Sequence, residues 1–133
     1  MSKYILNSNE IKCYVDRIRS ELEKIDFSKP ITDSRIVEVL ASKRIKKIYM
    51  GTKSIECYIF EASKESYIVI PAKLCTCIDF MINVAMKCLK TYCYHILAVE
   101  YARRSGKYAI IDIDKLDESL KMIFKIIISG TSR

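Results

Sequence analysis

The spacing of hydrophobic residues predicts a helix near the start of the chain. Between residues 9 and 26, apolar side chains recur at intervals of three and four, as expected for one face of a helix. Either Asn7 or Ser8 can cap its first turn, and Pro30 prevents its continuation because proline cannot occupy a helix interior. The apolar positions of this predicted helix are Ile11, Val15, Ile18, Leu22 and Ile25.

Two further helices follow from the same kind of pattern. One covers residues 33–43, with Thr32 or Asp33 as its cap, and the other covers residues 115–128, with Asp114 as its cap. The apolar residues of the last helix extend over more than one face. It therefore either is buried within its own domain or meets a partner chain. The candidate partner-binding residues are Leu120, Ile123, Phe124 and Ile127.

The middle of the chain changes to a pattern typical of strands. Short runs rich in isoleucine and tyrosine are separated by polar turn residues, and they lie at residues 44–50, 55–61 and 66–71. The simplest arrangement of three such strands is an antiparallel meander.

Beyond the meander, residues 78–90 form an apolar spacer that could contain a short helix, and residues 92–104 predict a helix that Gly106 ends. Residues 108–113 predict a short extended segment. The expected fold class is therefore α+β, in one domain of 133 residues. It would consist of a helical part (1–43), a core of strands and helix (44–104) and a C-terminal helical extension (105–133).

Composition limits the possible environments of the chain. Half of the residues are hydrophobic, but no run approaches the roughly 18 apolar residues of a membrane span, and the first residues are too short and polar for a signal peptide. We therefore expect a cytoplasmic protein with reduced thiols despite six cysteines. The abundance of isoleucine, lysine and tyrosine is typical of some thermophilic archaeal proteins.

The formal net charge of +7 permits contact with nucleic acid. If the basic residues converge, they would form a phosphate-binding face; the alternative is that they are ordinary solvated side chains. Tyr92 and Tyr94 could likewise stack on bases or pack inside the domain. The basic candidates are Lys43, Arg44, Lys46, Lys47, Lys87, Lys90, Arg103, Arg104 and Lys107.

Three cysteines and the single histidine form two pairs, each with one intervening residue. Cys75 and Cys77 make the first pair, and Cys93 and His95 make the second. Thiolate and imidazole are the ligands that Zn²⁺ prefers in tetrahedral structural sites. Neighbours two apart on a regular helix point away from each other, so we expect the first pair in a turn or strand end and the second at a helix start.

The other cysteines have different expected roles. Cys88 is the main rival ligand, although a packed thiol is the favoured interpretation, and we expect Cys13 and Cys57 to be buried or half-buried. No catalytic set emerges, because the only histidine is assigned to the metal. The three glycines do not form a glycine-rich phosphate loop. We therefore expect a protein that is not an enzyme.

The order C-x-C, fifteen residues, C-x-H resembles the SWIM zinc finger. The segment Cys75–Phe80 is similar to the family's C-x-C-x-x-F, and Cys93–Ala98 is similar to its C-x-H-I-x-A. Tyr94 departs from the lysine that many members carry there. The resemblance covers roughly residues 44–104 and implies one structural zinc ion after a β-hairpin.

A stand-alone chain of this size resembles the small SWIM subunit of Shu-type complexes, including archaeal relatives. That resemblance implies an accessory role in homologous recombination and DNA repair, with a RecA/RadA-family paralogue ATPase as partner and DNA as a possible second partner. It implies neither a membrane nor a small-molecule substrate, and a nucleoid-associated location if DNA is bound. The alternative is an independent DNA-binding zinc module, such as a regulator or a mobile-element remnant.

Overall fold

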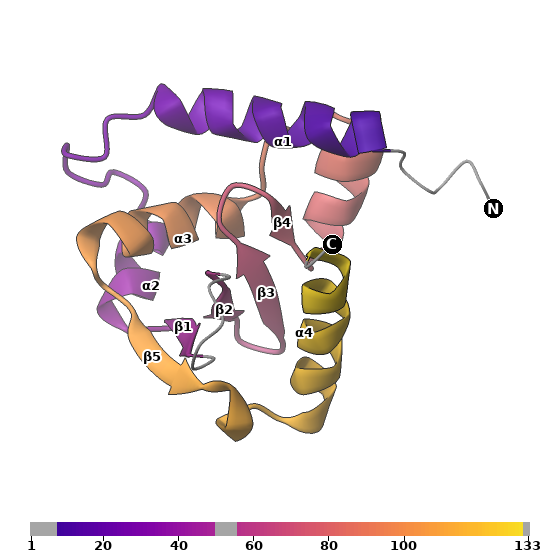
Figure 1. Ribbon diagram of the computed structural model, residues 1–133. Coiled ribbons are helices and arrows are strands. Elements are labelled where there is room, and N and C mark those ends of the chain that lie inside the picture. Colours follow the sequence, from indigo (N-terminus) through magenta and orange to yellow (C-terminus); the bar gives the residue numbers. More distant parts are fainter. Residues whose placement is uncertain (1–7, 50–55, 132–133) are drawn as a thin grey trace.

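The protein has a mixed α+β fold built on a five-stranded sheet (Figure 1). The structure, a computed structural model, describes residues 8–49 and 56–131, without the side chains of residues 8–13, 124 and 127–131. The strand order is β4-β3-β2-β1-β5. The α+β class expected from the sequence is therefore confirmed.

The central three strands form the predicted antiparallel meander. They are β1 (Ile45–Tyr49), β2 (Tyr58–Glu61) and β3 (Ser66–Ile70), with antiparallel pairing of β1 to β2 and of β2 to β3. The outer strands were not predicted as members of the sheet. The two-residue β4 (Leu74–Cys75) pairs antiparallel with β3, and β5 (Ala109–Asp112) pairs parallel with β1.

Within the described residues, four α-helices surround the sheet. They are α1 (Ser8–Glu23), α2 (Ser34–Ala41), α3 (Tyr94–Ser105) and α4 (Glu118–Thr131). Asp33 caps α2 by accepting a hydrogen bond from the amide of Arg35, as the sequence indicated. Gly106 ends α3 with a left-handed φ of 71°.

The start of the last helix was predicted wrongly. A short 3-10 helix, η3 (Ile113–Lys115), ends at the residue where the helix was expected to begin, and α4 begins three residues later than expected. The reason is local: the carboxylate of Asp117, rather than that of Asp114, accepts a hydrogen bond from the amide of Leu120 at 2.8 Å. The spacer contains a π-helix, η2 (Phe80–Met86).

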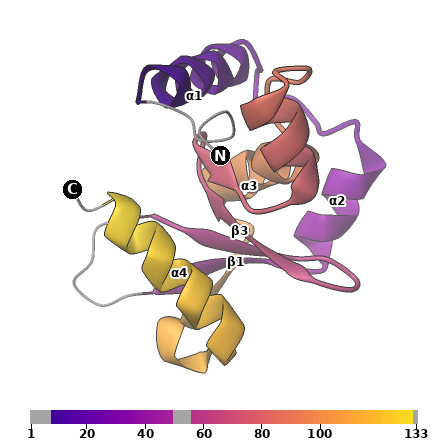
Figure 2. The ribbon, with the colours of Figure 1, turned by 90° about the vertical axis from the view of Figure 1, so that its right-hand side faces the viewer.

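The helices α1, α2 and α3 lie on one side of the sheet and α4 lies on the other (Figure 2). A hydrophobic cluster lies on each face. The larger cluster joins α1, α2, α3 and η2 to one face and includes Ile18, Ile36, Phe80 and Val99. The smaller cluster lies on the face covered by α4 and consists of Ile48, Cys57, Ile59, Ile68, Ile70 and Leu116. The two prospective ligand pairs belong to the larger cluster's side of the sheet.

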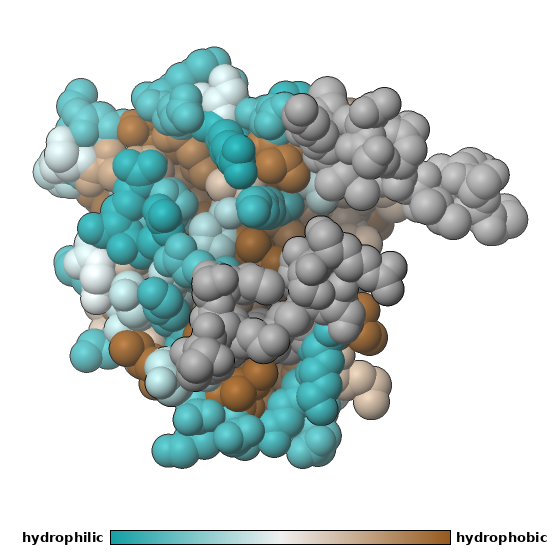
Figure 3. All heavy atoms as spheres, viewed as in Figure 1, coloured by the Kyte–Doolittle hydropathy of each residue, from teal (hydrophilic) through white to brown (hydrophobic). Residues whose placement is uncertain are grey.

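On the face shown in Figure 3, hydrophilic residues cover most of the surface, and hydrophobic patches emerge between them. The exposed apolar side chains include Ile110 on β5 and Met122 and Ile126 on α4. Within the described residues, no helix combines the length and the apolar character that crossing a membrane requires.

Candidate metal centre

The fold brings Cys75, Cys77, Cys93 and His95 together at the junction of the sheet and α3. One potential ligand atom from each residue lies within 4.8 Å of all the others. The Sγ atom of Cys75 is 3.7 Å from Nδ1 of His95, and tetrahedral zinc places a thiolate and an imidazole nitrogen roughly 3.6 Å apart. The cluster therefore fits a metal ion and is compatible with zinc.

The first ligand pair is fixed by the edge of the sheet. Cys75 belongs to β4, and Thr76 extends the pairing with β3, because its amide donates to the carbonyl of Ile68 at 3.1 Å. The hydroxyl of Thr76 also accepts a hydrogen bond from the amide of Ile68 at 2.9 Å. The residue between the two cysteines thus anchors both of them to the sheet, in agreement with the predicted strand end.

The second pair lies at the first turn of α3. Cys93 is the N-cap residue, with extended backbone angles of −89° and 166°, and His95 is the second residue of the helix. The extended residue allows Cys93 and His95 to face the same point although they are only two positions apart. The positive end of the helix dipole also favours a thiolate at this position.

The electrostatics of the three thiols are unequal. Hydrogen bonds from Cys75 and Cys93 lower the pKa of Cys77, and the amide of Phe80 donates to its Sγ at 3.3 Å. Hydrogen bonds with Cys77 and Cys93, together with burial, raise the pKa of Cys75. For Cys93, the hydrogen bond with Cys75 lowers the pKa, but that with Cys77 and burial outweigh it and raise it to about 12.

Of the three thiols, Cys77 is the one whose surroundings lower its pKa. For Cys75 and Cys93, the backbone amides of Cys77 and Ile96 act to lower the pKa, but hydrogen bonding among the thiols and burial raise it by more. All three cysteines are buried, so three thiolates would repel one another strongly without a nearby cation. This donor set suits a divalent ion with an affinity for sulfur.

Aromatic side chains hold the imidazole in place. The ring of His95 lies 4.6 Å from that of Phe60 and 4.7 Å from that of Tyr67. Tyr94 packs against Phe60 at 5.7 Å and carries the guanidinium of Arg35 over its ring at 4.6 Å. The sequence left open whether Tyr94 stacks on bases or packs inside the domain. In the structure it packs beside the metal centre.

Side-chain hydrogen bonds within the segment between the two ligand pairs help to hold it in place. Asp79 accepts hydrogen bonds from Asn83 at 2.7 Å and from Lys90 at 2.8 Å. Cys88, expected to be a packed thiol, is instead exposed; it lies two residues after η2 and has a left-handed φ of 54°. It is outside the ligand cluster, whereas Cys57 is buried as expected. The side chain of Cys13 lies outside the described residues.

The basic residues are distributed over several ion pairs. Arg44 pairs with Glu38, Lys46 with Glu61, Lys90 with Asp79, Arg103 with Glu56 and Glu100, and Arg104 with Glu100. Lys47 lies over the ring of Tyr108, and Lys87 is exposed. Lys43, Arg104 and Lys107 line one pocket, and Arg103 and Arg104 line a second.

The candidate partner residues on α4 have different environments. Leu120 is half-buried against the smaller cluster, whereas Ile123 is 41% exposed. The side chains of Phe124 and Ile127 lie outside the described residues. Tyr92 is partly buried against the larger cluster.

Sequence reasoning missed the buried carboxylate of Glu100 in α3. Its side chain is 5% exposed and binds Arg103 at 3.2 Å and Arg104 at 2.7 Å. The spacing of three and four residues on one helix was the available signal, but nothing in the sequence indicated that this carboxylate is buried.

Comparison with known proteins gives one limited likeness. An uncharacterized protein of Archaeoglobus fulgidus is 38% identical over 65 residues, which cover 49% of this chain and 54% of the relative. The chain thus spans about half the length of this relative. No family model matches the chain, and no solved structure matches it. The resemblance to the SWIM zinc finger therefore rests on the sequence motif alone.

Proposed function

We propose that the chain is a non-catalytic, zinc-binding accessory subunit of homologous recombination or DNA repair that binds a RecA/RadA-family paralogue. The observation that carries this proposal is the convergence of Cys75, Cys77, Cys93 and His95 in the order that resembles a SWIM finger. Four protein ligands leave no coordination position for a substrate, which favours a structural role for the ion.

The segment that the ion would order also has an unusual surface. Five of the described large apolar side chains that are exposed lie between residues 78 and 89, and we call them the metal-loop surface: Ile78, Met81, Ile82, Met86 and Leu89. Exposed apolar side chains concentrated in one short segment favour a protein-binding role, and methionine adapts easily to a partner's shape. Zinc would therefore shape a protein-binding surface. The exposed residues of α4, including Ile123, would provide a second one.

Co-expression with a RecA/RadA-family paralogue from the same genome tests the proposal. The paralogue should co-purify with the chain, and the pair should be more soluble than the chain alone. Ile78→Ser combined with Leu89→Ser should weaken binding without affecting folding, because these side chains are 75% and 72% exposed. Ile110→Ser, at a position 69% exposed on β5, serves as the matched control.

The alternative function is that of an independent DNA-binding zinc module, which the net charge of +7 favours. Such a module would be monodisperse alone and would bind duplex DNA with an affinity that falls steeply with salt concentration. That result, together with no binding to any RecA-family paralogue, would contradict the proposed accessory role.

A further inference from the structure

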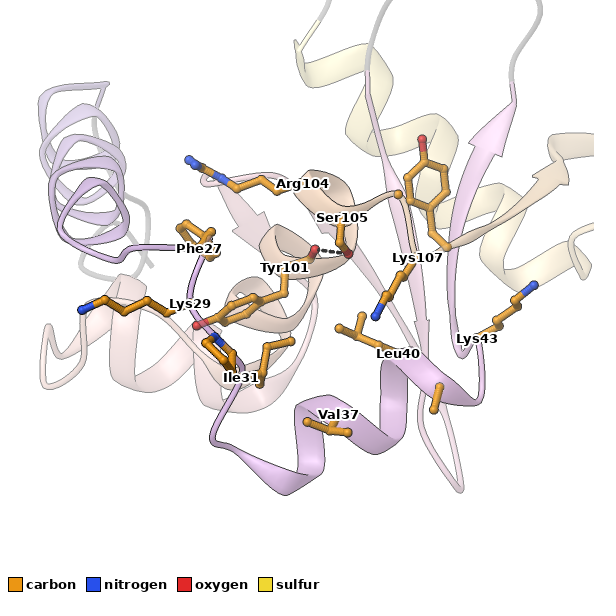
Figure 4. Close-up of a pocket in the computed structure, with 14 residues that line it drawn as sticks. Phe27, Lys29, Ile31, Val37, Leu40, Lys43, Tyr101, Arg104, Ser105 and Lys107 are labelled. Carbon is orange, nitrogen blue, oxygen red and sulfur yellow. Dashed lines mark hydrogen bonds between the residues drawn. The ribbon is translucent and has the colours of Figure 1, made fainter.

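A pocket of about 730 Å³ lies at the opposite end of α3 from the metal centre (Figure 4). The C-terminal end of α3, the face of α2 and the connection before α2 form its walls. Its floor is apolar and contains Ile31, Val37 and Leu40. Val37 is 46% exposed although it belongs to a helix whose neighbouring apolar residues are buried. The pocket therefore presents apolar surface to a ligand.

Four cationic residues surround this apolar floor: Lys29, Lys43, Arg104 and Lys107, and none of the residues that line the pocket is acidic. Figure 4 shows Lys107 directed toward Leu40, whereas Lys29 and Lys43 lie on opposite flanks. Arg104 is already paired with Glu100 at 2.7 Å. Among the described residues, the three lysines take part in no ion pair.

The backbone of the pocket is well fixed. Gly106 caps α3 through its amide, which donates to the carbonyl of Ala102, and the amide of Lys107 donates to the same carbonyl at 3.1 Å. Lys43 follows α2 with a left-handed φ of 55°, at a position where glycine is more usual. A cation is thus present on the rim where the backbone would favour a glycine.

The aromatic residues of the pocket already have partners. The guanidinium of Arg104 lies 4.2 Å from the centre of the Phe27 ring, and Tyr101 packs edge-to-face with the same ring, with their centroids 4.7 Å apart. Lys47 lies over Tyr108 at 5.8 Å. Single-stranded nucleic acid binds by stacking bases on free aromatic faces, so these rings favour a different ligand.

We propose that this pocket binds an acidic peptide segment of a partner protein, with an aliphatic side chain on the apolar floor. The carboxylates of the peptide would lie on both sides of that anchor, near Lys29, Lys43 and Lys107. An apolar anchor surrounded by complementary charges is a common mode of peptide recognition. The proposal needs neither the metal ion nor a recombination partner, and thus goes beyond the function proposed above.

The test uses the full metal-loaded chain and a fluorescein-labelled peptide of aspartate and glutamate with one central leucine. Binding should be saturable by fluorescence anisotropy. In amide NMR spectra, the shifted signals should come from residues 29–43 and 101–108. Replacing the central leucine by serine, or Lys29→Gln, Lys43→Gly and Lys107→Gln combined, should each weaken binding at least about tenfold.

Two matched controls separate the pocket from bulk charge. Lys64→Gln, Lys87→Gln and Lys125→Gln combined remove the same number of charges at exposed positions outside the pocket and should leave the affinity unchanged. Val37→Asp should weaken binding more than Val37→Asn, which has the same shape without the charge. Each variant's metal content should match that of the parent chain.

Three results would overturn the proposal. The first is that the leucine peptide shows no saturable binding. The second is that both triple variants weaken binding equally, which would mean attraction by net charge alone. The third is that a single-stranded oligonucleotide of equal charge shifts the same amides and binds more tightly than the peptide, which would make the pocket a nucleic-acid site.

Discussion

The cysteines whose side chains are described have three kinds of environment. Cys75, Cys77 and Cys93 are buried together beside His95, Cys57 is buried in the opposite cluster, and Cys88 is exposed. Burial raises the pKa of Cys57 to about 12, so its thiol is protonated and shielded at neutral pH. Since the thiolate is the reactive form, the three environments should differ in reactivity.

We therefore expect Cys88 to react with a maleimide or iodoacetamide much faster than Cys57 at pH 8. Mass spectrometry of peptides from the labelled, metal-loaded protein measures this difference. Cys88→Ser should remove the fast site. Rapid modification of Cys57 in the folded protein would contradict the burial of this thiol.

Loss of any one of the four ligands should release the metal. Cys93→Ser or His95→Ala should reduce bound metal from about one ion per chain to well below that, because a structural site depends on all four ligands. The buried sulfurs that remain would lose their counter-charge, so the loss of stability should reach about 3 kcal/mol or more. The midpoint of thermal unfolding should fall by about 10 °C.

Cys88→Ser provides the matched control for this experiment, since it also replaces a thiol by a hydroxyl in the same segment. It should retain the metal and the thermal midpoint. Release of the metal by Cys88→Ser would show that the ligand assignment is wrong, and so would a stable, folded His95→Ala protein with a full complement of metal.

The identity of the ligands was predictable from the sequence, but their surroundings were not. Two pairs of metal-binding residue types, each with one intervening residue, indicate a site without knowledge of the fold. The contacts of His95 with Phe60 and Tyr67 join residues about 30 positions apart. Such contacts depend on strand register, which single-sequence patterns do not determine.

Among the secondary-structure elements, two helices are followed by a residue with a left-handed backbone. One of these residues is a glycine, which adopts this backbone easily, and the other is a lysine, which does not. Gly106 directly follows α3 with a φ of 71°, and Lys43 follows Ser42, the C-cap of α2, with a φ of 55°. A left-handed backbone costs little for glycine and about 1 kcal/mol for most other residues. A Cβ atom added to Gly106 would meet no atom within 4 Å outside its chain neighbours. Substitution by alanine would therefore change only the conformational energy of the backbone.

Gly106→Ala should therefore lower the free energy of unfolding by about 1 kcal/mol, and Lys43→Gly should leave it equal or raise it by up to about 1 kcal/mol. Urea unfolding of the metal-loaded variants measures both changes. A stabilised Gly106→Ala protein, or a Lys43→Gly protein that is destabilised by more than 1 kcal/mol, would contradict the role assigned to these two helix ends.

The sequence predicted element boundaries least accurately where several neighbouring residues could each cap a helix. Asp112, Asp114 and Asp117 all lie near the start of the last helix, and each could cap a turn. Asp112 caps the 3-10 helix η3 and Asp117 caps α4. The apolar spacer predicted at most a short helix, and its π-helical geometry has no signature in the spacing of hydrophobic residues.

In the whole molecule, the parallel pairing of β1 with β5 adds a strand from the C-terminal part of the chain to the edge of the sheet. Lys46 pairs with Ala109 and Tyr49 with Asp112, across a connection that contains the rest of the sheet, the metal centre and α3. The sequence predicted an extended segment there, but not its partner, because parallel pairing over a long connection leaves no local pattern. The sheet lies between the two hydrophobic clusters. After β5 the chain leads into α4, which packs against the smaller cluster through Leu120.

That division predicts how the protein responds to loss of its metal. The cluster of Cys75, Cys77 and Cys93 belongs to the larger hydrophobic core, whereas Ile59, Ile68 and Leu116 belong to the smaller one on the opposite face. A chelator should therefore release residues 74–97 first, because their ordering depends most directly on the ion. Amide hydrogen exchange should accelerate in this segment, while the amides of β1, β2 and β5 remain protected.

The control is the same protein with zinc restored after chelation, which should regain slow exchange in residues 74–97. Equal loss of protection across the whole sheet would mean that the core cannot persist without the ion. Unchanged exchange in this segment would mean that the ion does not order it. Only the selective result is consistent with an ion that shapes one surface of a domain held together elsewhere by apolar packing.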